Sequence, residues 1–210
     1  MKEVVFTMER AYVPPFLFFV QREFGVDTTV NCTVYRLLCR HLGINPDYLS
    51  HRIQTIFLNG KPVDDVEVAV VRDGDRLTLS AAMPGLLGAV LRKAGYYAAM
   101  RSSISHREEA VNLSGGKGRV YLKLLNLVMG ELGYYFLHRG MWVRGRDLHT
   151  FLKDYGAGVV EGCSGLTIDG EECDCSLVFP WRYDDHEVWL QVSGSGISSG
   201  VSSGGSGVRS

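Results

Sequence analysis

Three cysteines and two histidines in the C-terminal half of the chain have the types and spacing closest to a chemical site. Cys173 and Cys175 are separated by one residue, and Cys163, His149 and His186 lie nearby in the sequence. Thiolate and imidazole bind zinc, but zinc sites usually show paired C-x2–4-C knuckles, and only one tight pair exists here. On a strand, Cys173 and Cys175 would point to one face and pack there. We therefore expect packed cysteines and no metal ion. A metal- or small-ligand-binding protein using Cys163, Cys173 and Cys175 is the alternative.

No other residues combine into a catalytic set. Cys39 and His41 are two positions apart on an expected helix, so their side chains would not face each other. The aspartates at 64–65, 73–75 and 184–185 fall in expected turns, where aspartate is common for conformational reasons. Neither a G-x-S-x-G nor a G-x-G-x-x-G motif stands at an expected strand–helix junction. We therefore assign no catalytic residue and no cofactor, and we expect a protein that is not an enzyme.

The charge balance argues against a strongly basic nucleic-acid-binding protein. Lys and Arg total 22, Asp and Glu total 23, and the formal net charge is −1. Positive charge is denser in two places, which we interpret as a solvated face: Arg92, Lys93 and Arg101, then Lys117, Arg119 and Lys123. The glycine-rich run 114–118 lacks the spacing of a phosphate-binding P-loop, so we expect a linker there.

The sequence favours neither secretion nor a membrane span. Arg10, Pro14 and Pro15 interrupt the first apolar stretch, so we expect no secretory signal. The longest apolar segment, 120–137, contains charged residues and makes a poor membrane span. The five cysteines are odd in number and lack the spacing of a disulfide framework. These features predict a reduced, cytoplasmic protein.

One pattern occurs twice along the chain, which indicates an internal repeat. Segment 55–60 runs into 72–79, and segment 165–170 runs into 183–190, with Gly170 following Gly60 by 110 residues. Apolar stripes also correspond, because Leu148, Phe151 and Leu152 follow Val34, Leu37 and Leu38 by 114 residues each. Two α+β modules of similar order are therefore expected.

In the first copy, strands are predicted at 4–8, 53–58, 68–71 and 77–79, and the apolar segment 16–24 fits either a short helix or a strand. The stripe within 34–42 predicts an amphipathic helix, with Thr33 as its N-cap and Gly43 as its stop. Asn59-Gly60 is a strong two-residue hairpin signal, because both residues tolerate positive φ.

In the second copy, 120–124 is the expected opening strand. The stripe of Leu148, Phe151, Leu152 and Tyr155 predicts a helix that is capped by Asp147 and ended by Gly156.

The motif Leu58-Asn59-Gly60-Lys61-Pro62-Val63, with 71–79 after it and the T-V-x-x-L-L start at 33–38, resembles the β-grasp sulfur carriers of thiamine and molybdopterin synthesis. The resemblance implies a ubiquitin-like fold, a mixed sheet crossed by one helix. Sulfur carriers end in a Gly-Gly whose carboxylate is activated. Here the equivalent region, 83–89, is internal, so carrier chemistry requires cleavage after the first module.

We therefore predict an α+β protein of two tandem β-grasp-like modules, at 1–83 and 119–192, joined by a connecting insert at 84–118 and followed by a flexible Gly/Ser tail at 193–210. The apolar insert is the expected interaction surface: Met83, Leu86, Leu87, Arg92, Lys93, Tyr96, Tyr97 and Met100. The expected function is a non-enzymatic interaction or accessory protein with an unknown protein partner. A sulfur carrier released by cleavage is a further alternative.

Overall fold

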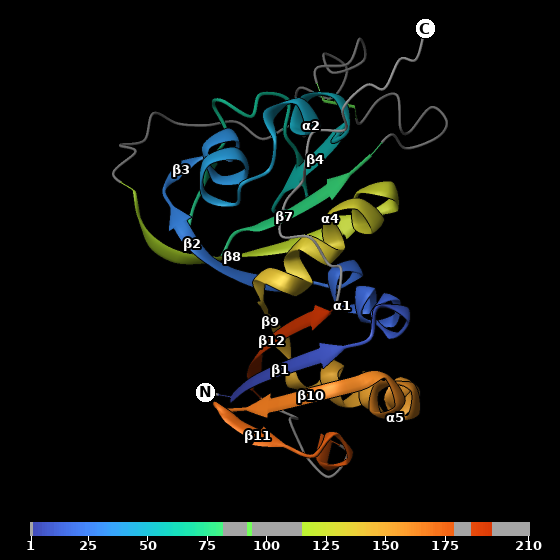
Figure 1. Cartoon of the computed structure of the whole chain (residues 1–210). Helices are drawn as coiled ribbons and strands as arrows, with labels where there is room; N and C mark the ends of the chain where they lie inside the picture. The colour runs from blue at the N-terminus through green and yellow to red at the C-terminus, as the bar shows by residue number, and fades with distance from the viewer. Residues whose placement is uncertain (1, 82–91, 94–114, 179–185, 195–210) are drawn as a thin grey trace, which may run out of the picture.

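The fold is α+β, with a large mixed sheet and few helices (Figure 1). The computed structural model describes residues 2–81, 92–93, 115–178 and 186–194. Its main sheet has ten strands in the order β11-β10-β1-β12-β9-β2-β8-β7-β4-β5. The contact between β9 and β2 at the middle of this order divides the sheet into two sets of five strands, which we call the first and second half-sheets.

The first half-sheet contains β2 (Phe24–Val30), β8 (Gly116–Leu125), β7 (Arg76–Ser80), β4 (Thr55–Leu58) and β5 (Lys61–Pro62). The pair β7–β8 is parallel, and the other three pairs are antiparallel. From Val120 to Leu124 every second residue of β8 is buried, as expected for a strand with one face on the core.

The second half-sheet contains β9 (Met141–Arg144), β12 (Glu187–Gly194), β1 (Lys2–Met8), β10 (Cys163–Ile168) and β11 (Glu171–Cys173). Its central pair β1–β12 is parallel, and the remaining pairs are antiparallel. From β2 and from β9 outward, the two half-sheets thus repeat one pattern of strand directions.

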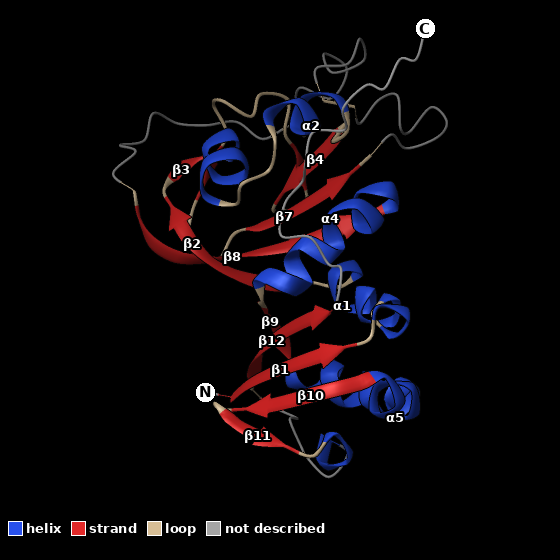
Figure 2. Ribbon diagram, in the orientation of Figure 1, coloured by secondary structure: helices blue, strands red, loops and turns tan. Residues whose placement is uncertain are grey.

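The longer helices connect strands of this sheet. They are α1 (Leu17–Gln21), η3 (Arg36–His41, a π-helix), α2 (Pro46–His51), α4 (Asn126–Arg139) and α5 (Gly145–Gly162). The helix η3 follows β2 and leads toward β4, while α5 follows β9 and leads into β10. The helix α4 packs on β7, β8 and β12 (Figure 2).

Shorter elements complete the chain. They are η1 (Arg10–Tyr12), η2 (Pro14–Phe16), η5 (Cys175–Val178) and the separate antiparallel pair β3 (Cys32–Thr33) with β6 (Val70–Val71).

The two central parallel pairs draw strands from opposite ends of the chain. The N-terminal strand β1 pairs with β10 and β12, whereas β8 pairs with β2 and β7. Each predicted segment, 1–83 and 119–192, therefore gives its opening strand to the half-sheet formed mainly by the other. The boundaries at 83 and 119 stay predictions about which segment folds alone.

Local turn and cap signals in the first copy are confirmed. The backbone N–H of Arg36 donates to Thr33 Oγ1 at 3.2 Å, and Gly43 has φ +71°. Asn59 and Gly60 both have positive φ between β4 and β5. The matching residues Asp169 and Gly170 also have positive φ, between β10 and β11. The same hairpin turn therefore occurs at the same place in both half-sheets.

Four predictions in and around the second copy are wrong in part or in full. Asp147 lies within the first turn of α5 and accepts a hydrogen bond from Arg22 rather than capping the helix. The helix continues through Gly156 and ends at Gly162, which packs against the ring of Tyr12 so closely that a Cβ would overlap it. The expected linker at 114–118 enters strand β8 at Gly116, and the expected tail enters β12, which ends at Gly194.

The ambiguous segment 16–24 contains helix α1 and the first residue of β2. Its aromatic residues join a cluster that links α1 to α5, with Phe151 lying 4.7 Å from Phe16 and 4.9 Å from Phe19 between ring centroids. All three rings are buried. Within the part of the chain that the structure describes, no helix is long and apolar enough to cross a membrane.

Candidate functional site

A cleft of about 950 Å³ lies beside the junction of the two half-sheets. The strands β2 and β9 meet in one residue pair, Gly25 with Trp142, and the cleft is lined by the part of β2 that follows. It is lined by residues of β2, the end of η3, the turn before β7, β8 and the end of α4: Asp27, Thr28, Thr29, Arg40, His41, Asp73, Gly74, Lys117, Gly118, Arg119, Tyr121 and Arg139.

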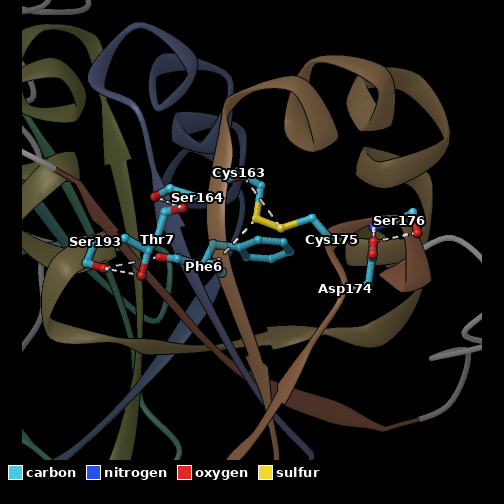
Figure 3. The surroundings of a disulfide bond; sticks show 9 residues. Phe6, Thr7, Cys163, Ser164, Asp174, Cys175, Ser176 and Ser193 are labelled. Carbon is cyan, nitrogen blue, oxygen red and sulfur yellow. Dashed lines mark hydrogen bonds between the residues drawn. A yellow bond between two sulfur atoms is a disulfide. The ribbon is translucent and has the colours of Figure 1, made fainter.

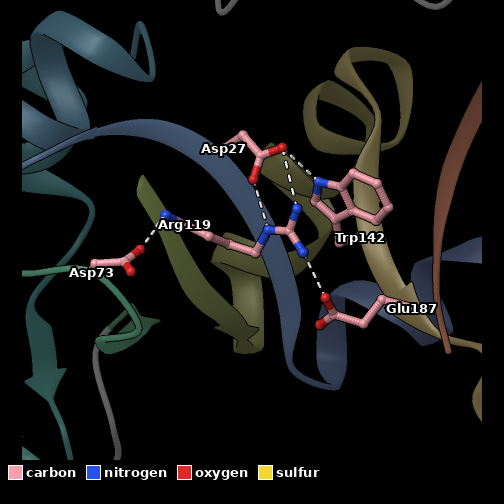
Figure 4. A network of polar contacts seen from close by, with 5 residues as sticks. All are labelled: Asp27, Asp73, Arg119, Trp142 and Glu187. Atoms are coloured by element: carbon pink, nitrogen blue, oxygen red, sulfur yellow. Dashed lines mark hydrogen bonds and ion pairs between the residues drawn. The ribbon is translucent and has the colours of Figure 1, made fainter. Parts of the chain in front are cut away.

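Arg119 on β8 joins the two half-sheets at the wall of this cleft (Figure 4). Its Nε donates to Asp27 Oδ1 on β2 at 2.6 Å, and its Nη1 donates to Glu187 Oε2 on β12 at 2.5 Å. The guanidinium also lies 4.1 Å from the ring centroid of Trp142, whose Nε1 donates to Asp27 Oδ2 at 2.8 Å. Charge-assisted hydrogen bonds and a cation–π contact therefore fix this guanidinium in place.

Gly25 makes room for this arrangement. A Cβ at Gly25 would lie 2.9 Å from Arg119 Cδ and 3.1 Å from Trp142 Cβ. Such separations are shorter than normal carbon–carbon contacts of about 3.5–4.0 Å, so only glycine lets Arg119 and Trp142 lie over β2 at this point.

The network favours the charged forms of both partners. Burial raises the pKa of Asp27, but the hydrogen bonds from Arg119 and Trp142 outweigh it and leave the pKa below its usual value. Burial lowers the pKa of Arg119, and its hydrogen bond and charge interactions with Asp27, together with the charge of Glu187, more than offset this and raise it. Arg119 is therefore a fixed cation whose charge is used within the protein.

A second hydrogen bond orders the start of β8. The backbone N–H of Arg119 donates to Asp73 Oδ1 at 2.7 Å, and the backbone N–H of Gly74 donates to the Arg119 carbonyl at 2.8 Å. The turn before β7 is thus tied to β8, which places Lys117 and Arg119 on the cleft.

Three further cations line the cleft: Arg40, Lys117 and Arg139. All three are exposed, and none forms an ion pair with another residue in the described ranges. Arg139 donates to Tyr135 Oη at 3.1 Å and to the His41 carbonyl at 3.4 Å. Their positive charge is available to a bound molecule.

Thr28 adds a polar group without a partner. It lines the cleft, and its Oγ1 is buried without a hydrogen-bond partner among the described residues. In the strand register Thr28 pairs with Gly118, so its side chain lies on the face of the sheet opposite Lys117 and Arg119.

The chemistry of the lining is electrostatic. Among the described residues that line the cleft there is no cysteine or serine, and its single histidine, His41, uses its backbone carbonyl to accept from Arg139. The cleft lining offers groups for ion pairing and hydrogen bonding.

Only two residues of the predicted interaction surface, Arg92 and Lys93, are among those that the structure describes. Met83, Leu86, Leu87, Tyr96, Tyr97 and Met100 lie outside the described residues. Arg92 and Lys93 are described, and Lys93 Nζ donates to the Leu49 carbonyl at 2.9 Å. Burial lowers the pKa of Lys93. This lysine therefore anchors its segment to α2.

The cysteines differ from the expectation. Cys163 at the start of β10 and Cys175 on η5 form a disulfide, with their Cα atoms 6.3 Å apart (Figure 3). The prediction that Cys173 and Cys175 share a strand face is wrong, because β11 ends at Cys173. Disulfides are rare in reduced compartments, so the expectation of reduced cysteines is corrected, and the cytoplasmic location stays a prediction.

The disulfide also bears on the metal alternative. Thiolates bind metals, and in the disulfide neither Cys163 nor Cys175 is a thiolate. Within the described ranges, no three His, Cys, Asp or Glu side chains are grouped to hold a metal ion. Around the disulfide, Ser164 Oγ donates to the Thr7 carbonyl and Ser193 Oγ to the Phe6 carbonyl, so these serines have structural partners (Figure 3).

Lys117 and Arg119 were recognisable in the sequence as part of a basic patch, which we interpreted as a solvated face. The sequence did not reveal the role of Asp27, Arg40, Trp142, Arg139 and Glu187, because these residues come from distant segments. The alternation of Lys117, Arg119 and Tyr121 along one strand was the available signal, because these residues share a face. Comparison of the chain with protein-family models, with curated proteins and with solved structures finds no match.

Proposed function

We propose that this chain is a non-enzymatic accessory protein on a duplicated β-grasp-like scaffold, and that it binds its partner protein through the cleft at the junction of the half-sheets. The observation that carries this proposal is the set of available cations, Arg40, Lys117 and Arg139, around a cleft whose wall is fixed by Arg119.

The strand pattern supports the duplicated scaffold. Each half-sheet has a short hairpin at one edge and one parallel pair, with helical structure between the innermost strand and the hairpin: η3 and the short helix α2 in the first half-sheet, and α5 in the second. This pattern is compatible with the mixed sheet and crossing helix that the sequence resemblance implies. The shared positive-φ turns at 59–60 and 169–170 add local support.

The same pattern argues against a sulfur carrier released by cleavage. A cut after 85 or 88 would separate β2 and β7 from β8, the strand that lies between them. The released piece would also carry β1, whose partners β10 and β12 are in the remainder of the chain.

A second candidate is a protein that binds a small molecule. The cleft volume of about 950 Å³ favours it, because ligand pockets commonly measure about 300–1,000 Å³. The site would then be the cleft rather than Cys163, Cys173 and Cys175, two of which are joined in the disulfide.

Charge reversal in the cleft tests the first proposal. Full-length tagged protein and the double variant Arg40→Glu/Lys117→Glu would be used to capture proteins from cells of the source species, and captured proteins would be purified and titrated against both. The matched control is Arg146→Glu/Lys153→Glu on the exposed face of α5. We expect a directly binding partner that is lost only with the cleft variant.

Recovery of the same directly binding partner with the cleft variant would contradict a role for the cleft. The second candidate has its own readout, which is mass spectrometry of small molecules released from freshly purified protein. A released compound that is absent from the cleft variant, with no cleft-dependent protein partner, would replace the first proposal by the second.

A further inference from the structure

The disulfide between Cys163 and Cys175 fastens one short element to the second half-sheet. Cys163 follows the last residue of α5 and opens β10, whereas Cys175 opens η5, which packs on α5 and β10. The hydrogen bonds of Asp174 are local, because its Oδ1 accepts from the backbone N–H of Ser176 at 2.7 Å and from the Ser176 hydroxyl at 2.6 Å (Figure 3). These bonds shape the turn, and the disulfide attaches it to the end of α5.

The hairpin that precedes η5 does not need a covalent bond. The hairpin β4–β5 in the first half-sheet turns at 59–60 as β10–β11 turns at 169–170, with positive φ at all four positions. Segment 55–62 contains no cysteine. The same turn therefore forms without a disulfide, and the disulfide acts on the element after the hairpin, which is η5.

The disulfide lies where a reductant can reach it. Cys163 and Cys175 are both partly exposed, and both also pack against the hydrophobic core. Reduction within the folded protein requires that a thiolate contact one of the two sulfur atoms. Partial exposure of both cysteines meets this requirement without unfolding of the half-sheet.

The reduced state also has hydrogen-bond acceptors. The Gly165 carbonyl oxygen lies 3.3 Å from Cys163 Sγ, and the Cys163 carbonyl oxygen lies 3.6 Å from Cys175 Sγ. After reduction each thiol can donate to its carbonyl oxygen. The oxidised and the reduced states are therefore both compatible with the surrounding fold.

We propose that the Cys163–Cys175 disulfide is a redox-sensitive latch, which holds η5 on α5 and β10 when it is oxidised and releases η5 when a dithiol reduces it. Release of η5 exposes the surface of α5 and β10 on which it packs. The half-sheet itself stays folded. This inference goes beyond the proposed function and does not involve the cleft.

The reduction is a thiol–disulfide exchange with a dithiol as the co-reactant. A thiolate of the dithiol attacks Cys163 Sγ or Cys175 Sγ, the bond between these sulfur atoms breaks, and a mixed disulfide forms. The second thiol of the reductant then attacks the mixed disulfide and leaves as part of an oxidised, cyclic product. Cys163 and Cys175 end as thiols that carry the two protons of the dithiol, and a disulfide oxidant reverses the reaction.

The kinetics of reduction give the first test. Full-length oxidised protein would be mixed with increasing concentrations of dithiothreitol under native conditions, quenched with an alkylating reagent and analysed by peptide mapping. We expect the rate at which Cys163 and Cys175 become alkylated to rise in proportion to the dithiothreitol concentration. A rate that does not depend on this concentration would mean that unfolding limits the reaction, which contradicts the latch.

Hydrogen exchange followed by mass spectrometry gives the second test. In the reduced protein, amides in segment 174–178 should exchange about tenfold faster or more than in the oxidised protein, because local opening becomes easier. Strands β1 and β12 should keep their protection, and the hairpin β4–β5 is the internal control that should not change. Reoxidation with oxidised glutathione should restore both the protection and the pairing of Cys163 with Cys175.

Variants connect this response to the named cysteines. Cys163→Ser and Cys175→Ser should each exchange like the reduced protein and should not respond to dithiothreitol. Cys173→Ser is the matched control, since it removes a free thiol two residues from Cys175 and leaves the disulfide in place. It should respond like the unaltered chain. Reduction of the unaltered chain gives the same measurement if either serine variant fails to fold.

The latch is overturned if reduction leaves the exchange of 174–178 unchanged. It is also overturned if β1 and β12 lose their protection together with η5, because the disulfide is then required by the whole half-sheet. Reoxidation that pairs Cys173 in place of Cys163 would contradict it as well. None of these outcomes affects the proposed function of the cleft.

Discussion

The carboxylate of Asp27 accepts hydrogen bonds from two neighbouring strands at the junction of the half-sheets. It accepts from Arg119 on the neighbouring strand and from the Trp142 indole of β9, so it connects β8 and β9 through β2. Glu187 performs the corresponding task from β12 by accepting from Arg119. Because Arg119 is thereby neutralised, the cleft gains a rigid wall, and the charge offered to a ligand comes from other residues.

The lowered pKa of Asp27 makes a pH-dependent prediction. A carboxyl whose pKa is lower in the folded state stabilises the protein above its unfolded pKa, near 3.9, and this stability is lost as the pH falls through the folded pKa. Asp27→Asn should therefore lower the free energy of unfolding by up to about 1 kcal/mol at pH 7, a small value because Asp27 is more than half exposed. The difference should shrink as the pH falls below the unfolded pKa and disappear below the folded pKa.

Urea unfolding of both proteins between pH 7 and pH 3 measures this effect. Asp154→Asn, on the exposed side of α5, serves as the control and should show little change at any pH. A loss of stability in Asp27→Asn that is the same at pH 7 and pH 3 would mean that packing, not the ionised carboxylate, explains the effect.

At the scale of single elements, the hairpins give the sharpest comparison between the two copies. Gly60 and Gly170 have φ of +78° and +86°, and a Cβ at either would meet no atom within 4 Å. Replacing each by alanine therefore changes only the backbone preference. Gly60→Ala and Gly170→Ala should each reduce the free energy of unfolding by about 1–2 kcal/mol.

Thermal or urea unfolding measures both changes, with Gly158→Ala as the control. Gly158 is on α5, has no atom within 4 Å of an added Cβ, and has no positive φ, so its replacement should stabilise the protein by about 0.5–1 kcal/mol. If Gly60→Ala and Gly170→Ala differ by more than their experimental errors allow, the two turns do not play equivalent roles.

Elements set by short-range chemistry could be predicted from the sequence. Thr33 caps the helix after it, and Asn59-Gly60 turns the chain, because each outcome depends on neighbouring backbone atoms. The end of helix α5 could not be predicted correctly from the sequence. The helix continues through Gly156 to Gly162, where contact with the ring of Tyr12 leaves no room for a Cβ. That contact joins residues far apart in the chain, and no local pattern reports it.

The candidate site was hidden for the same reason. Lys117 and Arg119 were visible as a basic pair, but their meaning depends on Asp27 and Glu187, which come from other strands. The disulfide of Cys163 and Cys175 was also missed, since it needs η5 to return to the start of β10. The α+β class could therefore be predicted from local sequence patterns. The cleft could not, because it forms only when distant segments pair.

At the scale of the whole molecule, the exchanged strands couple the two halves of the chain. In the first half-sheet β8 lies between β2 and β7, and in the second β1 lies between β10 and β12. Neither segment 1–83 nor segment 119–192 therefore contains the complete set of strands for either half-sheet. Ion pairs also cross the junction, with Glu23 bound to Arg144 and Arg22 bound to Asp147. We expect the described parts of the chain to unfold as one cooperative unit.

Two fragments make this prediction specific. Fragment 1–83 has β1 without β10 or β12, and it has β2 and β7 without the intervening β8, so it should remain unfolded. Fragment 22–125 keeps β2, β8, β7, β4 and β5 with η3, and it should be the better folded of the two. Amide dispersion in two-dimensional NMR spectra and far-UV circular dichroism measure the difference. Each fragment is compared with its own urea-unfolded spectrum, so the two fragments need not have equal lengths.

A well-dispersed spectrum for 1–83 would show that the first segment folds alone with its own opening strand. The exchange would then be unnecessary for folding, and a carrier released by cleavage would again be structurally feasible.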